Sequence, residues 1–289
     1  MSRKIKFAEK DYISSLLPVN RKKQFSDLFK TEFLTLLKLA LILLLSFLPY
    51  IFVSITTGLT LSSNAKDLIS QGLTKLETNE ALASSISIFA LFRCLTLLVP
   101  FVVLAGIARV NRLMVYSEGV LFFKDFIRGI KDNFKTYFIT GLIMILLIFA
   151  TEVFGYYIGG SNIGNASFAL NAIIIGLVFL IITPIFMINL VQGSIYSLPY
   201  FKGIVNAARV FVRSILLSFV FALLPFTIFL LSTFNALPIM WYGTIVMIVV
   251  LISPVYLLGV HMYFVSRFDV LINKKYYPQI YRKGLEIKE

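Results

Sequence analysis

The chain has 289 residues, of which 58% are hydrophobic and 14% charged, and its formal net charge is +13. Soluble domains contain about 25% charged residues, so this composition excludes an ordinary soluble domain. A basic charge of this size can also mark a nucleic-acid surface. Here the basic residues border long apolar runs, where anionic lipid headgroups account for them. We therefore expect a lipid bilayer with anionic headgroups as partner, and no nucleic acid.

Six apolar runs are long enough to cross a bilayer, which takes about 20 residues in a helix. None alternates apolar and polar residues with period two, as the strands of a membrane barrel do. We predict an all-α fold: a single polytopic membrane helix bundle over residues 1–289, with six transmembrane helices. The expected spans are about 33–57, 83–108, 137–158, 168–191, 214–234 and 236–264, between basic tails at 1–32 and 265–289.

The distribution of basic residues predicts the orientation. Residues 1–32 hold eight Lys or Arg, the second loop (109–136) holds six, the fourth loop three and the C-terminal tail six. The first, third and fifth loops together hold two. Cytoplasmic loops carry the excess of Lys and Arg. We therefore expect both termini in the cytoplasm.

The first outer loop, 58–82, is the longest on its side. Its apolar residues Leu68, Ile69, Leu73 and Leu76 have helical spacing. We expect this stretch to form a short amphipathic helix that lies on the outer surface.

Two inner segments, Phe123–Lys135 and Phe201–Arg213, resemble each other at an offset of 78 residues. Their apolar residues at helical spacing alternate with basic ones, which predicts amphipathic helices on the cytoplasmic side. The offset suggests a parallel repeat of helical hairpins, and chance similarity is the alternative. The helices either lie among the headgroups only or also dock a partner. The candidate docking residues are Phe123, Lys124, Phe126, Lys131, Phe134, Lys135, Lys202, Arg209 and Arg213.

Charged residues inside the apolar runs form a second group of candidates. Arg93 lies about ten residues into the second span and Glu152 lies near the outer end of the third. A charge at this depth should face protein or water. We hypothesise that the two residues pair across the hairpin, either to fix its packing or in a substrate-binding or gating role. Asn189, near the inner end of the fourth span, is expected to bond another helix.

Sequence motifs for catalysis are absent. There is no Walker-type phosphate loop, no HExxH, no cluster of carboxylates and no serine–histidine arrangement. The single cysteine, Cys94, and the single histidine, His261, exclude a metal cluster built on those residues. We therefore expect a non-enzymatic protein without catalytic, cofactor-binding or metal residues.

The stretch Leu97–Phe138 resembles the YesL-type family of bacterial integral membrane proteins. The matching phrase reads F-x-D-F-x-x-x-F-K-x-N-F-K, and this chain has Ile130 where the family often has an aromatic residue. A second similar segment runs from Ser197 to Leu231. The matching residues of the phrase are Phe123, Asp125, Phe126, Lys131, Asn133, Phe134 and Lys135.

The resemblance implies a protein of the bacterial cytoplasmic membrane, associated with carbohydrate uptake systems of the ABC type. Three functions follow as hypotheses. The first is an accessory component that docks ABC transporter subunits through its inner helices. The second is an autonomous small-solute transporter with a central cavity. The third is a lipid-interacting structural membrane protein.

Overall fold

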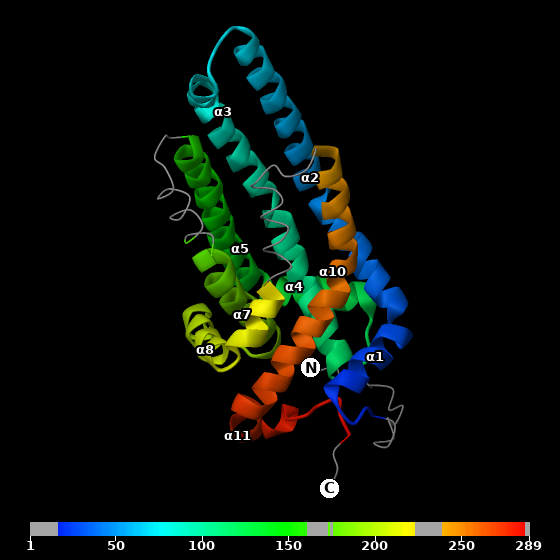
Figure 1. Ribbon diagram of the computed structural model, residues 1–289. Helices are drawn as coiled ribbons and strands as arrows, with labels where there is room; N and C mark the ends of the chain where they lie inside the picture. The colour runs from blue at the N-terminus through cyan, green and yellow to red at the C-terminus, as the bar shows by residue number, and fades with distance from the viewer. Residues whose placement is uncertain (1–16, 161–172, 174–175, 223–238, 287–289) are drawn as a thin grey trace.

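Figure 1 shows the computed structural model, which describes residues 17–160, 173, 176–222 and 239–286. Every regular element in these residues is helical, which confirms the predicted fold class. The elements are α1 (Arg21–Thr31), α2 (Phe33–Ser70), α3 (Lys75–Thr96), α4 (Leu98–Val115), α5 (Phe122–Gly160), η2 (Leu177–Ile182), α7 (Thr183–Ile195), α8 (Tyr200–Arg213), α10 (Ile239–Phe268), η3 (Asp269–Asn273), α11 (Lys274–Tyr276) and η4 (Pro278–Ile280).

Five helical segments of the described chain are long and apolar enough to cross a membrane. A sixth candidate is the pair Tyr200–Arg213 and Ile215–Ala222, which is bent by 106°. Much of the surface of these segments is apolar and exposed, as in Leu34, Leu45 and Phe52 of α2. The architecture is therefore a polytopic helical membrane bundle.

The expected helix on the outer surface at 58–82 is wrong. No proline occurs between Pro49 and the end of α2, and the helix continues to Ser70, which makes it about 57 Å long at 1.5 Å per residue. A turn with Gly72 at φ +91° follows, and a capping box between Thr74 and Glu77 starts α3. The loop is thus a helical hairpin that extends beyond the roughly 30 Å hydrocarbon core.

The second span has a one-residue interruption, and its inner loop is shorter than predicted. The helix is interrupted at Leu97, three residues before Pro100, which has no backbone N–H to continue the hydrogen-bond ladder. Beyond the break α4 continues to Val115, and only residues 116–121 connect it to α5. Most of the loop predicted at 109–136 is therefore helix.

Helix α4 lies at the centre of the bundle and packs against α5, α2, α10 and α7 (Figure 1). Two glycines permit the close approach of α4 and α5. A Cβ atom on Gly106 would lie 2.6 Å from the ring of Phe126, and one on Gly129 would lie 2.7 Å from Cβ of Arg109. Larger residues at either position would force the two helices apart.

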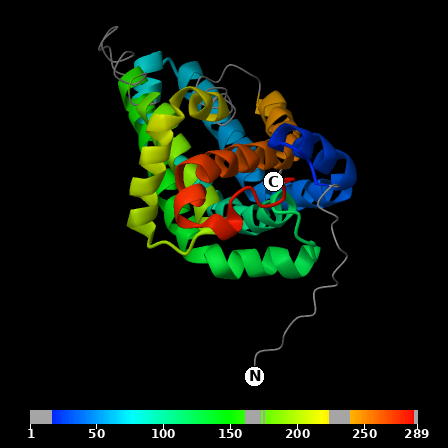
Figure 2. The same ribbon diagram turned by 90° about the horizontal axis from the view of Figure 1, so that it is seen from below.

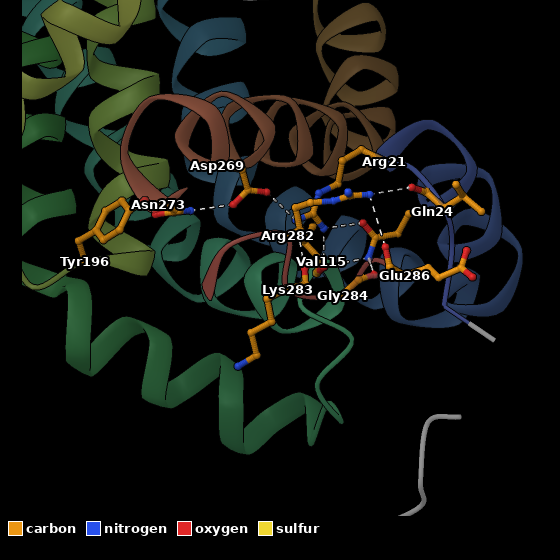
Figure 3. Close-up of polar contacts among 11 residues, drawn as sticks. Arg21, Gln24, Val115, Tyr196, Asp269, Asn273, Arg282, Lys283, Gly284 and Glu286 are labelled. Atoms are coloured by element: carbon orange, nitrogen blue, oxygen red, sulfur yellow. Dashed lines mark hydrogen bonds and ion pairs between the residues drawn. The ribbon is translucent and has the colours of Figure 1, made fainter. Parts of the chain in front are cut away.

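Both terminal segments fold onto the end of α4, and we call this arrangement the terminal clasp (Figure 3). Arg21 of α1 donates to the carbonyl of Val115 at 3.0 Å and forms an ion pair of 3.2 Å with Asp269. Gln24 donates to Val115 at 2.8 Å and to the carbonyl of Gly284 at 3.1 Å. The described parts of the tails predicted at 1–32 and 265–289 are therefore folded structure.

We call the end of the bundle with the terminal clasp the basic end; Figure 2 looks onto it. It comprises α1, residues 116–121, the start of α5, α8 and residues 269–286. The first and last described stretches of the chain meet here, since the backbone N–H of Glu286 donates to the carbonyl of Pro18 at 3.1 Å.

Candidate binding cavities and interface helices

A cavity of about 330 Å³ lies among the membrane-spanning helices, and we call it the intramembrane cavity. Helices α2, α4, α5, α7 and α10 and segment η2 all contribute to its walls. Most of its lining is apolar, as the following examples show: Leu43, Phe101, Met144, Phe179, Val250 and Leu257.

A few polar groups interrupt this lining. Asn111 and His261 are each 2% exposed, and neither Asn111 Oδ1 nor His261 Nε2 has a hydrogen-bond partner among the described residues. Buried polar atoms are normally bonded. These two atoms are therefore available to a hydroxyl, an amide or a water molecule inside the cavity.

The structure brings Arg93 and Glu152 together. Arg93 Nη2 of α3 donates to Glu152 Oε2 of α5 at 2.6 Å. The glutamate side chain is 9% exposed and the arginine side chain 27%. Glu152 also lines the intramembrane cavity, where it is the one carboxylate among the described lining residues. The pair thus connects α3 to α5 and places a negative charge at the cavity wall.

A second cavity of about 290 Å³, the polar pocket, lies at the basic end between α4, α5, α7 and the start of α8. Arg109 and Arg112 of α4 line it together with Asn189 and Gln192 of α7. Gln192 donates to Asn189 Oδ1 at 2.9 Å, so the predicted bond of Asn189 is made within α7 itself. Sequence reasoning missed Gln192, although its spacing of three residues from Asn189 places both on one helix face.

The two inner amphipathic segments have the same three faces. A face against the protein contains Phe126 and Gly129 in α5 and Ala207 and Val210 in α8. An apolar face, 45–81% exposed, contains Phe123, Ile127, Phe134, Phe201, Val205 and Val212. An exposed basic face contains Lys124, Lys131, Lys135, Lys202, Arg209 and Arg213. Such helices suit the boundary of a membrane, where protein, acyl chains and headgroups meet.

Phe126 is not available for docking, because it is 7% exposed and packs against Gly106. The other predicted docking residues are exposed.

The predicted repeat of helical hairpins is matched in the faces of the two helices. Residues 78 positions apart lie on the same face, as Phe123 and Phe201 do on the exposed apolar face. The connections differ, however, since α5 runs straight into its span whereas α8 is bent by 106° from the next helix.

The described residues contain no group of three or more His, Cys, Asp or Glu side chains that could hold a metal ion.

The chain matches no protein-family model, no curated protein and no solved structure. The class is therefore defined by the fold and the two cavities alone: a multi-pass helical membrane protein with an apolar cavity among its spans and a polar pocket at its basic end. The resemblance to the YesL-type family stays a prediction.

Proposed function

We propose that this protein is a non-enzymatic membrane protein that holds an apolar or amphipathic molecule, such as a lipid acyl chain, in the intramembrane cavity. The observation that carries the proposal is the apolar lining of a cavity of about 330 Å³. Ligand pockets typically measure about 300–1,000 Å³ and use a few polar groups to fix orientation. Asn111 and His261 supply such groups.

The same lining argues against a sugar as the occupant. Each buried hydroxyl of a sugar needs a hydrogen-bond partner, and an unmet one costs on the order of 1–3 kcal/mol in proteins. The cavity offers few such partners. An acyl chain needs none, and a hydroxyl or protonated carboxyl at its polar end can donate to Asn111 Oδ1 or bond to His261 Nε2.

The proposal places the protein in a bacterial cytoplasmic membrane with both termini in the cytoplasm. Support comes from the excess of Lys and Arg in the segments that form the basic end. Protease protection of tags at either end of the chain, in sealed inside-out and right-side-out vesicles, tests this orientation. Cleavage of both tags in right-side-out vesicles would overturn it.

Binding of a fluorescent long-chain fatty acid to the purified full chain tests the cavity. Val249 lines the cavity, whereas its neighbour Ile248 is 51% exposed on the outside of α10. Val249→Phe should narrow the cavity and weaken binding at least about tenfold, because the added ring occupies space the acyl chain needs. Ile248→Phe also introduces a phenyl ring, but on the exposed side of α10, and should leave binding unchanged. Equal affinities for the wild type and both variants would refute the proposal.

A second candidate function is an accessory role beside a carbohydrate ABC-type uptake system. The exposed basic faces of α5 and α8 favour it, because they leave a charged surface free to meet other proteins. A pull-down of tagged protein from its native membrane should then recover ABC transporter subunits. Lys131→Glu with Arg209→Glu should abolish that recovery, and Lys22→Glu, an exposed control on α1, should not. Solute flux in liposomes containing this chain alone would favour an autonomous transporter instead.

A further inference from the structure

Arg112 is a charged residue without a counter-ion. It is partly buried at the polar pocket, and it forms no ion pair with any residue that the structure describes. One of its terminal nitrogens donates to the carbonyl of Ser194 at 2.9 Å, and its Nε has no hydrogen-bond partner. Removing a charge from water is costly unless an opposite charge or hydrogen bonds compensate it. The positive charge of Arg112 in this pocket would therefore favour a negatively charged ligand.

The two amides of α7 add unpaired atoms to the same pocket. Asn189 is 2% exposed and Gln192 is 1% exposed. Asn189 Oδ1 accepts from Gln192, which leaves Asn189 Nδ2 as a buried donor without a partner. Gln192 also donates to the carbonyl of Gly203, and its Oε1 is without a partner. A ligand that accepts from Asn189 and also carries a hydroxyl would satisfy both amides.

The first turn of α8 completes the wall of the pocket. Its N-cap, Pro199, provides no side-chain bond, and the first helical bond runs from Gly203 N to Pro199 O. The N–H groups of residues 200–202 thus have no helical acceptor. Tyr200 and Gly203 both line the pocket, so this positive end of the helix lies at its wall.

The acidic residue of the pocket is already engaged. Asp132 lies on its rim with a side chain 49% exposed, 3.0 Å from Arg109 Nη1 and 3.5 Å from Arg128 Nε. Asp125 lies 3.8 Å from Arg109 as well. These acids compensate Arg109 and leave the charge of Arg112 uncompensated.

We propose that the polar pocket binds a phosphate-type anion through Arg112, the Asn189 amide and the first turn of α8. Phosphate oxygens accept from arginine, from amides and from helix N-termini. The phosphate belongs either to an anionic lipid headgroup or to a small soluble molecule. This inference does not rest on the intramembrane cavity, since it involves a different pocket.

The test uses the full chain in phosphatidylcholine nanodiscs, titrated with inorganic phosphate in a calorimeter at constant ionic strength. A parallel arm uses nanodiscs that contain phosphatidylglycerol and counts retained lipid by native mass spectrometry. Asn189→Asp keeps the acceptor for Gln192 but replaces the free donor with a negative charge. Asn206→Asp introduces the same charge on α8 outside the pocket lining, which makes it the matched control.

Asn189→Asp should weaken binding at least about tenfold, because a charge-assisted hydrogen bond is replaced by repulsion. Asn206→Asp should change it less than about twofold, because its charge lies outside the pocket lining and is screened by solvent. Arg112→Gln is a second variant, since glutamine can still donate to Ser194, and it should also weaken binding. A unimodal size-exclusion profile verifies the fold of each.

Saturable binding of inorganic phosphate that Asn189→Asp removes supports a soluble phosphate compound. Retention of phosphatidylglycerol alone, with the same sensitivity, supports a lipid headgroup. The proposal is overturned if neither probe binds the wild type, or if Asn189→Asp and Asn206→Asp behave alike.

Discussion

Replacing Asp269 with asparagine should open the terminal clasp. Asp269 is 5% exposed, lies 3.2 Å from Arg21 and accepts from Asn273 at 2.8 Å. Burial lowers the pKa of Arg21, and Asp269 is the main group that raises it again. The substitution keeps the shape of the side chain and leaves the guanidinium without its counter-ion.

The free-energy cost of Asp269→Asn follows from the burial of the ion pair. Breaking a buried ion pair costs about 3–5 kcal/mol. Arg21 keeps three neutral acceptors, which are Gln24 Oε1, the Val115 carbonyl and the Lys283 carbonyl. We therefore expect a loss of about 2–3 kcal/mol. Amide hydrogens in residues 17–31 and 269–286 should exchange roughly 30- to 150-fold faster, at tenfold per 1.4 kcal/mol.

Glu118→Gln is the matched control, because it also removes one carboxylate charge from the basic end. The Lys283–Glu118 pair is 2.5 Å long, but its side chains are 41% and 31% exposed. Exposed pairs contribute about 0–1 kcal/mol, so exchange should rise only a few-fold. Hydrogen exchange with mass spectrometry in detergent measures both variants. Equal protection in the two would refute the reasoning that burial of the Arg21–Asp269 pair holds the clasp.

Three shorter predictions concern other parts of the bundle. Arg93→Glu and Glu152→Arg should each lower the midpoint of thermal unfolding, and the double swap should recover most of the lost midpoint. A double variant that unfolds at the same midpoint as either single variant would exclude a packing role for the pair. Gly203→Ala places a Cβ 2.5 Å from Asn189 Oδ1. It should lower the free energy of unfolding by about 1–3 kcal/mol and the same thermal midpoint with it. Gly119→Ala, whose Cβ would meet nothing within 4 Å, should leave the midpoint unchanged. A spin label at position 201 should be relaxed more by oxygen than by a water-soluble nickel chelate, because Phe201 is 81% exposed on the apolar face of α8; the reverse order would place that face in water.

Hydropathy predicted the helical bundle, since a span is defined by length and composition alone. Hydropathy gave the wrong arrangement at residues 58–82, because a helix can continue out of the membrane with the same spacing of apolar residues. It continues until a residue such as glycine or proline ends it. The apolar residues there have helical spacing whether the helix lies on the membrane surface or continues the span. What ends α2 is the turn at Gly72, and the capping box at Thr74 and Glu77 could have located the start of α3.

The candidate residues divide in a similar way. Arg93 and Glu152 could be placed near each other from the rise along two antiparallel helices, because depth in a hairpin depends only on counting residues. The polar pocket could not be predicted, because it depends on how α4 and α7 are rotated about their own axes. Asn111 and Arg112 are neighbours in sequence but line different cavities.

Helices α4 and α7 form a wall shared by the two cavities, and their residues divide by face. On α4, Ala108 and Asn111 line the intramembrane cavity and Arg112 lines the polar pocket. On α7, Leu190 lines the first and Asn189 the second. Consecutive residues point about 100° apart on a helix, so polar residues inside an apolar span need not face each other or water. In this bundle Asn111 lines the intramembrane cavity whereas Arg112 and Asn189 line the polar pocket, so the direction of each polar side chain decides which cavity it reaches.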